Sequence, residues 1–226
     1  MKTNKINVKV LAEIAIFAAL AIALDYIQGG YSKGLFLNGG SIGIAMIPIF
    51  IISFRRGIVP GLICGLIVSL IQMLGGLYIM NTSYFDDWRS SVAGPFIQVL
   101  LDYVLAYTLV GLSGAFSGLY HNAQTKGQKI LWVVVGCSVG ALAKYAMHVL
   151  SGGFFYLNYG NSFMGVSDSS WLYSFIYNGA YCIPNWIVCS AIVSFIAVVY
   201  PQIITANYEQ KENSDAANEV ISNEQI

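Results

Sequence analysis

Residues 131–150 read LWVVVGCSVGALAKYAMHVL, an apolar run long enough to cross a membrane as a helix. A transmembrane helix needs about 20 mostly apolar residues, whereas a transmembrane β-strand alternates apolar and polar residues over about ten positions. Neither this run nor IPIFIIS at 47–53 alternates, so we expect helices. Similar runs recur along the chain and predict six spans, at about residues 10–27, 40–54, 57–80, 94–120, 129–151 and 171–200.

The composition also indicates a protein embedded in a lipid bilayer. Of the 226 residues, 57% are hydrophobic and 10% are charged, whereas a soluble domain carries about 25% charged residues. Eleven basic residues balance eleven acidic ones, which excludes a nucleic-acid binder that depends on a basic surplus. The large apolar fraction excludes an intrinsically disordered chain.

Lysine and arginine residues predict the orientation of the spans, because cytoplasmic loops are enriched in them. With six spans, the side opposite the termini holds only Lys33 and Arg89. The side of the termini holds eight of these residues: Lys2, Lys5, Lys9, Arg55, Arg56, Lys126, Lys129 and Lys211. We therefore expect both termini in the cytoplasm, a membrane domain over residues 1–205 and a disordered polar tail at 206–226. The apolar start is interpreted as the first helix and not as a cleaved signal peptide.

Motifs for catalysis and for nucleotide binding are missing from the sequence. No HExxH, Walker A or GxSxG pattern occurs. The four cysteines form no CxxC pair and lie in predicted spans, where a thiol behaves as a small hydrophobe. We therefore predict no metal site, no cofactor and no ATPase activity.

Ionisable side chains inside the spans indicate a functional site, since each costs on the order of 3 kcal/mol to place in a bilayer. Asp102 lies in the fourth predicted span, and Lys144 and His148 share one face of the fifth because they are four residues apart. Asp25, at the outer end of the first span, is interpreted as an interfacial charge that water reaches. A buried Asp102–Lys144 pair that only ties two helices together is the alternative to a site.

Aromatic residues are dense in the part of the chain that follows Lys144. Eleven of them lie between residues 145 and 181. An aromatic belt at the membrane interface accounts for several, but a belt does not require Asn178 among the rings or a carboxylate at the same depth. We therefore favour a pocket for a flat, cationic ligand that forms hydrogen bonds.

Small residues predict where helices approach one another closely. The glycine pairs at 61 and 65, 114 and 118, and 136 and 140 are four residues apart, and we expect them to pack inside the bundle. A stripe of alanines on the first predicted helix, at 12, 15, 19 and 23, packs internally or contacts another membrane protein.

Five stretches together resemble the thiamin-specific S component of energy-coupling factor (ECF) transporters. They are EIAIFAALAIAL (13–24), MIPIFIISFRRGIVPGLICG (46–65), LDYVLAYTLVGLSGAF (101–116), KYAMHVLSGGFFY (144–156) and YSFIYNG (173–179). The resemblance extends in the same order over about residues 10–200. The FRRG-xx-PG turn and the K-x3-H-x3-G spacing make it specific when they occur together.

This resemblance implies a six-helix vitamin binder in the bacterial plasma membrane, without ATPase activity. Such a protein joins an ECF module of one transmembrane scaffold protein and two ABC ATPases. The resemblance implies that Ala15 and Ala19 meet the scaffold protein and that the first outer loop closes an outward pocket. Matched motif by motif, the substrate-binding residues are Asp102, Tyr103, Lys144, His148, Gly152, Tyr156, Tyr173 and Asn178, with Tyr78 as a looser match.

The chain departs from the family pattern at three places in this pocket. The family has Glu where this chain has Asp102, and Trp near position 156 where this chain has tyrosine. The first outer loop of the family carries a tryptophan, whereas LFLNGGSIG (35–43) has none. Since an acid is retained, a cationic ligand is still expected, either thiamin or a relative such as its pyrimidine precursor.

The sequence therefore predicts an all-α integral membrane protein that binds thiamin, or a close relative, for import by a separate ATP-driven module. Asp102 would balance the thiazolium charge or accept hydrogen bonds from the aminopyrimidine, and Tyr156 would stack on a ring. A stand-alone secondary transporter is one alternative, although we find no internal repeat. A membrane enzyme with Asp102 and His148 as acid and base is another, although no metal or nucleophile accompanies them.

Overall fold

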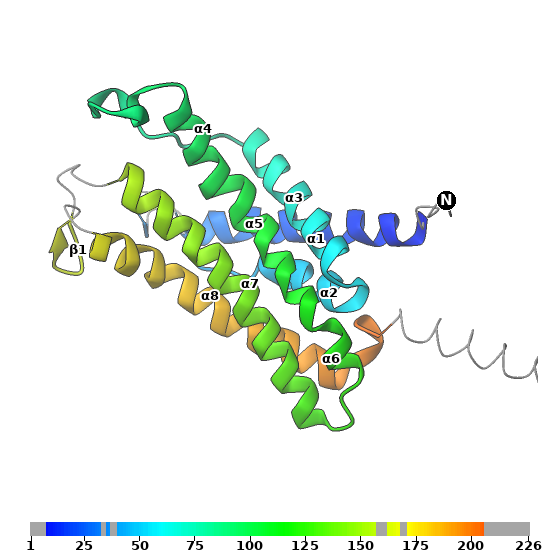
Figure 1. The fold of residues 1–226 in the computed structure, drawn as a ribbon. Coiled ribbons are helices and arrows are strands. Elements are labelled where there is room, and N and C mark those ends of the chain that lie inside the picture. The colour runs from blue at the N-terminus through cyan, green and yellow to red at the C-terminus, as the bar shows by residue number, and fades with distance from the viewer. Residues whose placement is uncertain (1–7, 33–34, 37–39, 157–161, 168–170, 206–226) are drawn as a thin grey trace, which may run out of the picture.

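The computed structural model describes residues 8–32, 35–36, 40–156, 162–167 and 171–205. The tail predicted at 206–226 lies outside these residues. The described chain is mainly helical, and its elements follow in this order: α1 (Val8–Ser32), α2 (Met46–Arg56), α3 (Ile58–Leu74), η1 (Thr82–Tyr84), η2 (Trp88–Ser90), α4 (Ala93–Val99), η3 (Leu100–Leu105), α5 (Ala106–Thr108), η4 (Leu109–Phe116), α6 (Ser117–His121), α7 (Lys126–Phe155), β1 (Ser162–Phe163), β2 (Val166–Ser167), α8 (Trp171–Val199) and η5 (Pro201–Ile203). Figure 1 shows α4 to α6 as one long rod that lies beside α7.

Four helical stretches in the described chain are long and apolar enough to cross a membrane: α1, the continuous run Ala93–His121, α7 and α8. The two spans predicted at 40–54 and 57–80 correspond to shorter helices, α2 with 11 residues and α3 with 17. Gly57 separates them with φ 90°, a conformation that favours glycine. Gly75 and Gly76 follow the end of α3, so residues 75–80 are not part of that helix as predicted.

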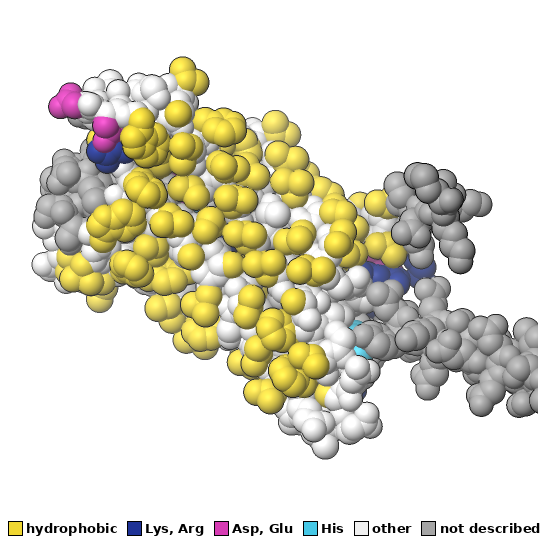
Figure 2. Space-filling view, in the orientation of Figure 1, with side chains coloured by type: hydrophobic (Ala, Val, Ile, Leu, Met, Phe, Trp, Pro, Cys, Tyr) yellow, Lys and Arg dark blue, Asp and Glu magenta, His cyan; other side chains and the backbone are white. Residues whose placement is uncertain are grey.

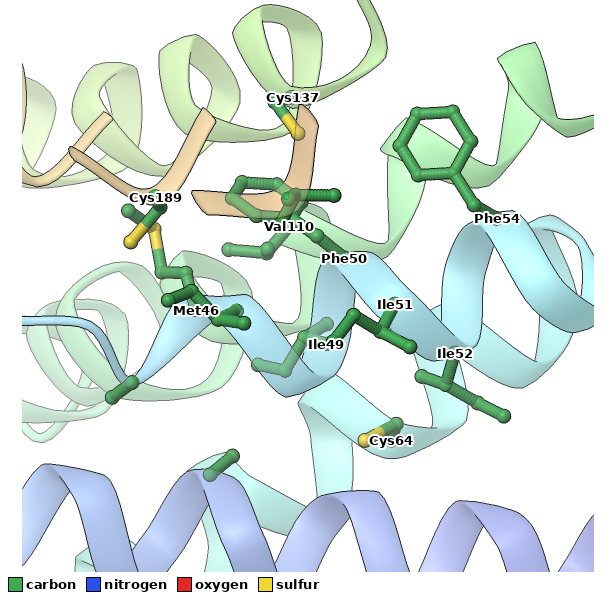
Figure 3. Packing of buried hydrophobic residues seen from close by; sticks show 14 of the residues in the cluster. Met46, Ile49, Phe50, Ile51, Ile52, Phe54, Cys64, Val110, Cys137 and Cys189 are labelled. Carbon is green, nitrogen blue, oxygen red and sulfur yellow. The ribbon is translucent and has the colours of Figure 1, made fainter. Parts of the chain in front are cut away.

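Helix α2 forms the centre of the hydrophobic core. All its residues from Met46 to Phe54 are buried, and a helix that is apolar on every side is stable only when other elements surround it. Figure 3 shows Met46 near Cys189 of α8, and Phe50 near Val110 of η4. The cysteines at 64, 137, 182 and 189 are buried free thiols, so those in this core pack as small apolar groups.

Glycines allow α3 and the run Ala93–His121 to touch along their backbones. A Cβ atom on Gly111 would lie 2.3 Å from the Leu62 nitrogen, and one on Gly65 would lie 2.3 Å from the Tyr107 carbonyl oxygen. Gly136 and Gly140 of α7 face the carbonyl oxygens of Ser113 and Val110 in the same way. The prediction that glycines pack inside the bundle is confirmed at 61, 65, 114, 136 and 140. It is wrong for Gly118, which is exposed.

A cluster of three charged residues fastens one end of the bundle, which we call the arginine end. Glu13 of α1 accepts hydrogen bonds from Arg55 Nε at 2.9 Å and from Arg56 Nε at 2.6 Å. Arg55 Nη1 also donates to the carbonyl oxygens of Gln202 and Ile203, so η5 is held here too. The beginning of α1 and η5 therefore lie at the same end of the molecule (Figure 1).

The surface between the two ends is apolar. Figure 2 shows hydrophobic side chains over most of the visible face, with acidic and basic side chains confined to its two ends. Segment 75–92 and the hairpin of β1 and β2 lie at the end opposite the arginines, which we call the loop end (Figure 1). This distribution is typical of a helical bundle surrounded by lipid tails, with polar groups where water begins.

We expect Glu13→Gln to lower the free energy of unfolding by about 3 kcal/mol, because removal of one partner from a buried ion pair leaves the other charge uncompensated. The side chain of Arg56 is only 2% exposed, so water cannot replace the lost carboxylate. The measurement is the unfolding transition of the purified protein in detergent.

Asp87→Asn is the matched control, because it breaks an ion pair with Arg89 whose side chains are 43% and 26% exposed. Exposed pairs contribute little to stability, so the control should shift the transition much less. Equal shifts in the two variants would contradict the structural importance of the Glu13 cluster.

Candidate functional site

A cavity of about 410 Å³ lies between the helices on the loop side of the core, and all nine sequence-predicted binding residues line it. They come from four separate parts of the chain: Tyr78; Asp102 and Tyr103; Lys144, His148, Gly152 and Tyr156; Tyr173 and Asn178. The fold therefore brings together every residue that the motif comparison had selected. Their contacts decide what the cavity can bind.

Asp102 is positioned by an irregular turn of helix. Residues 100–105 form the π-helix η3, and π-turns inside α-helices occur frequently at functional sites because they re-aim side chains. The Asp102 carboxylate contacts α7 through both oxygens. Oδ1 lies 3.1 Å from His148 Nδ1, and Oδ2 accepts a 2.6 Å hydrogen bond from Ser151 Oγ.

No ion pair within 4.0 Å joins Lys144 to Asp102, so the buried pair that was the alternative to a site does not form. Among the described residues, the basic side chain within 4.0 Å of the Asp102 carboxylate is His148. Lys144 is 6% exposed, and its Nζ atom lies 3.5 Å from the centre of the Tyr107 ring. The face of an aromatic ring attracts a cation, so Tyr107 stabilises this buried ammonium group.

Helix α8 contributes a connected set of polar groups. Asn178 Nδ2 donates to the carbonyl oxygens of Ser174 and His148, and Asn178 Oδ1 accepts a 2.5 Å hydrogen bond from Tyr181. A Cβ atom on Gly152 would lie 2.2 Å from Ser174 Oγ, so glycine at this position lets α7 and α8 approach. These contacts hold Asn178 in one orientation at the cavity wall.

Aromatic rings line the cavity toward the loop end. The rings of Tyr78 and Tyr156 are stacked with centroids 6.4 Å apart. Tyr156 Oη accepts a hydrogen bond from the buried Gln98 side chain at 3.0 Å, and Tyr103 Oη accepts one from the Tyr78 backbone at 2.7 Å. The orientation of these rings is therefore set by hydrogen bonds as well as by packing.

Segment 81–92 is tied to the end of α7 beside these rings. Arg89 Nη1 donates to the Phe154 carbonyl oxygen at 2.9 Å, and Trp88 packs edge-on against Phe154 and Phe155. The hydrogen bond from Arg89 holds the pKa of Asp87 below its usual value, so this pair stays charged at neutral pH.

The segment between α1 and α2 contributes backbone to the cavity. Gly40 and Ser41 line it, and Asn185 Nδ2 donates to the Ser41 carbonyl oxygen at 2.7 Å. Phe36 packs against Tyr177 and Tyr181 of α8, with ring centroids 5.9 and 5.3 Å apart. The segment between α1 and α2 thus packs a phenylalanine against two tyrosines of the cavity wall, and residues 37–39 lie outside the described chain.

A further set of lining residues lies outside the nine matched positions: Asp25, Tyr26, Gly40, Ser41, Gln72, Gly75, Gly76, Tyr107, Ser174, Tyr177, Tyr181 and Asn185. Of these, Tyr177 and Tyr181 belong to the aromatic-rich stretch that indicated a pocket. Asp25 is the important correction, because it was interpreted as an interfacial charge and instead lines the cavity. Tyr107 Oη donates to Asp25 Oδ1 at 3.1 Å. The only available signal was that Asp25 is ionisable and lies in an apolar helix.

Ala15 and Ala19 lie away from the cavity, on the exposed face of α1. Ile14, Ala18 and Ala21 lie on a different face of α1 and are buried. Internal packing therefore does not explain the small side chains at 15 and 19. In the part of the chain that the structure describes, no group of three or more His, Cys, Asp or Glu side chains is arranged to hold a metal ion.

Comparison with known proteins gives consistent matches over nearly the whole chain. A family model described as thiamine transporter protein matches residues 11–205. The thiamine transporter ThiT of Bacillus subtilis is 35% identical over 204 residues, which cover 87% of this chain and 94% of that protein. The thiamine transporter ThiT of Lacticaseibacillus paracasei is 28% identical over 215 residues, which cover 92% and 96%.

The fold of a solved relative also agrees with the one described here. The structure of ThiT from Listeria monocytogenes has a TM-score of 0.67 and 28% identity, and the match covers 88% of this chain and 98% of that one. The relatives and the apolar helices together identify a multi-pass bacterial membrane protein. The cavity residues, the helical fold and the extent of these matches lead to one conclusion: the chain belongs to the thiamine transporter family.

Proposed function

We propose that this protein is an S component that binds thiamin, or a close relative, in the cavity and delivers it to an ECF module for ATP-driven uptake. The observation that carries the proposal is the convergence of the nine motif-matched residues on one cavity of about 410 Å³. The membership of the chain in the thiamine transporter family supports the choice of ligand.

The chemistry of the cavity suits a molecule that has a cationic ring and a hydrogen-bonding ring. Thiamin has both, as a thiazolium and an aminopyrimidine. The Asp102 carboxylate offers negative charge, and the Tyr78–Tyr156 pair offers stacking surfaces. His148 and Asn178 offer polar atoms whose orientations are held by Asp102 and Tyr181.

Polar groups that are already oriented lose little conformational entropy when the ligand binds, which favours high affinity. The shorter acid at position 102 is held in place by contacts of its two oxygens with His148 Nδ1 and Ser151 Oγ. Tyr156 replaces the larger indole ring of the family with a smaller ring that Gln98 orients. These substitutions keep the charge and the stacking surface but change the shape of the cavity.

The topology that accompanies this function has six membrane-crossing helices, with α2 and α3 as the short ones and both termini in the cytoplasm. The common location of the start of α1 and of η5 supports termini on one side. The arginine end would then face the cytoplasm and the cavity would open outward, as the positive-inside rule requires.

The exposed face of α1 at Ala15 and Ala19 is the proposed contact with the transmembrane scaffold protein of the ECF module. The two side chains are one helical turn apart and point away from the bundle. Small residues at such spacing let two helices approach closely in lipid. The two ABC ATPases of the module would supply the energy, since this chain has no nucleotide-binding motif.

Removal of the charge at Asp102 is expected to weaken binding of thiamin. We expect Asp102→Asn to raise the dissociation constant about 10- to 150-fold, since a charge-assisted hydrogen bond contributes roughly 1.5–3 kcal/mol. Calorimetric titration of the purified protein in detergent with thiamin measures the change.

Asp86→Asn is the control, because Asp86 is exposed at the loop end and does not line the cavity. It removes the same formal charge and should leave the dissociation constant unchanged. An unaltered affinity in Asp102→Asn would remove Asp102 from the binding site.

Bulky side chains on the alanine stripe are expected to separate binding from transport. The double variant Ala15→Trp, Ala19→Trp should bind thiamin normally, because neither residue lines the cavity. Uptake should fail, because a tryptophan prevents close helix approach. Binding is measured on the purified protein, and uptake of radiolabelled thiamin in cells that contain the full transporter.

The matched control is Ile16→Trp, Leu20→Trp, at the same spacing on a neighbouring exposed stripe of α1. These residues are already large, so uptake should continue. Full uptake with both double variants would exclude the alanine stripe as the contact. If, in addition, no ATPases co-purify with the protein, a stand-alone transporter would be favoured.

A further inference from the structure

Asp25 is a second carboxylate of the cavity, and none of the roles proposed above uses it. It comes from α1, a different element from the one that carries Asp102. Gln28 Nε2 donates to Asp25 Oδ1 at 2.9 Å and Tyr107 Oη donates to the same oxygen at 3.1 Å. Both hydrogen bonds from described residues therefore end on Oδ1, whereas Asp102 uses both of its oxygens to contact α7.

Tyr107 connects Asp25 with the ammonium group of the cavity. Its hydroxyl donates to Asp25, and the face of its ring lies 3.5 Å from Lys144 Nζ. Lys144 lies four residues before His148 on α7, so its Cα atom is about one turn closer to the arginine end than that of the residue that Asp102 contacts. The two carboxylates thus have different partners in one cavity: Asp25 contacts Tyr107 and Gln28, and Asp102 contacts His148 and Ser151.

The charges of the lining residues do not cancel. Counted as formal charges, Asp25 and Asp102 contribute two negative charges and Lys144 one positive charge, with the lining tyrosines and His148 counted as neutral. Without a ligand the cavity then has a formal net charge of −1, which a ligand with a single positive charge neutralises.

Without Asp25 the formal charge of the cavity would be zero, and a cationic ligand would make it positive. Asp102 and Lys144 alone would balance, so a cationic ligand would leave one uncompensated positive charge among buried groups. Such a charge is unfavourable where the dielectric constant is low. A neutral ligand would meet no such penalty.

We propose that Asp25 sets the net charge of the cavity and so selects a ligand with one positive charge over an uncharged ligand of the same shape. This inference rests on the proposed function, because it assumes that the cavity binds thiamin. It assigns specificity to a residue that lies outside the nine motif-matched positions and contacts Tyr107 and Gln28.

The test compares two ligands of one shape in the wild type and in Asp25→Asn. Thiamin is the cation, and a thiamin analogue in which carbon replaces the thiazolium nitrogen is the uncharged isostere. Titrations are made in detergent at about pH 8, where an ordinary imidazole is neutral. Asp25→Asn should weaken thiamin binding about tenfold or more and change binding of the uncharged analogue by less than about threefold.

Retained binding of the uncharged analogue also shows that the variant is folded. Asp25→Glu keeps the charge and should keep the wild-type preference for thiamin, which separates charge from side-chain shape. Asp86→Asn, outside the cavity, should change neither ligand.

Each other outcome contradicts a specific statement. Equal weakening for both ligands, or unchanged thiamin binding, would overturn the role of Asp25 while the wild type still binds thiamin. Failure of the wild type to bind thiamin would instead overturn the proposed function itself. Loss of thiamin binding in Asp25→Glu as severe as in Asp25→Asn would show that shape, and not charge, is what position 25 supplies.

Discussion

The ammonium group of Lys144, buried in an apolar bundle, is the constraint on which the cavity depends. A charged side chain at membrane depth is costly unless opposite charge, a ring face or a ligand compensates it. Here the Nζ atom of Lys144 lies 3.5 Å from the centre of the Tyr107 ring, and carboxylates from two other elements line the same cavity. In the function proposed above, the excess of formal negative charge in the cavity matches the single positive charge of thiamin. The cost of burial and the affinity for the ligand would then have one physical origin.

Irregular helix geometry makes this arrangement possible. The π-helical segment that contains Asp102 is followed by the 3₁₀ segment η4, and both lie in a run that packs on α3 through glycine contacts. Asp102 and the Tyr107 ring both reach the cavity from this one rod. Helix α2, buried from Met46 to Phe54, fills the core of the bundle, and the Glu13 cluster joins α1, α2 and η5 at the arginine end.

Much of the cavity lining was predictable from the sequence, because motif spacing and helix periodicity act locally. The spacing of Lys144, His148 and Gly152 places them on one face of α7, and the cavity contains all three. The helix lengths were less predictable: the ends of α2 and α3 depend on glycines whose conformations follow from packing. Asp25 was misjudged because its environment is made by Tyr107, a residue 82 positions away in the sequence.

The amino-acid sequence by itself determined that this is a helical membrane protein, which faces of its helices carry the polar groups, and to which family it is related. Those properties follow from composition and from local periodicity, which need no knowledge of neighbours. Only the tertiary structure decided that Asp102 contacts His148 and Ser151 instead of Lys144, that Asp25 shares the cavity, and that Ala15 and Ala19 point away from it. These are properties of distances between helices, and such distances are set by the packing of side chains that lie far apart in the chain.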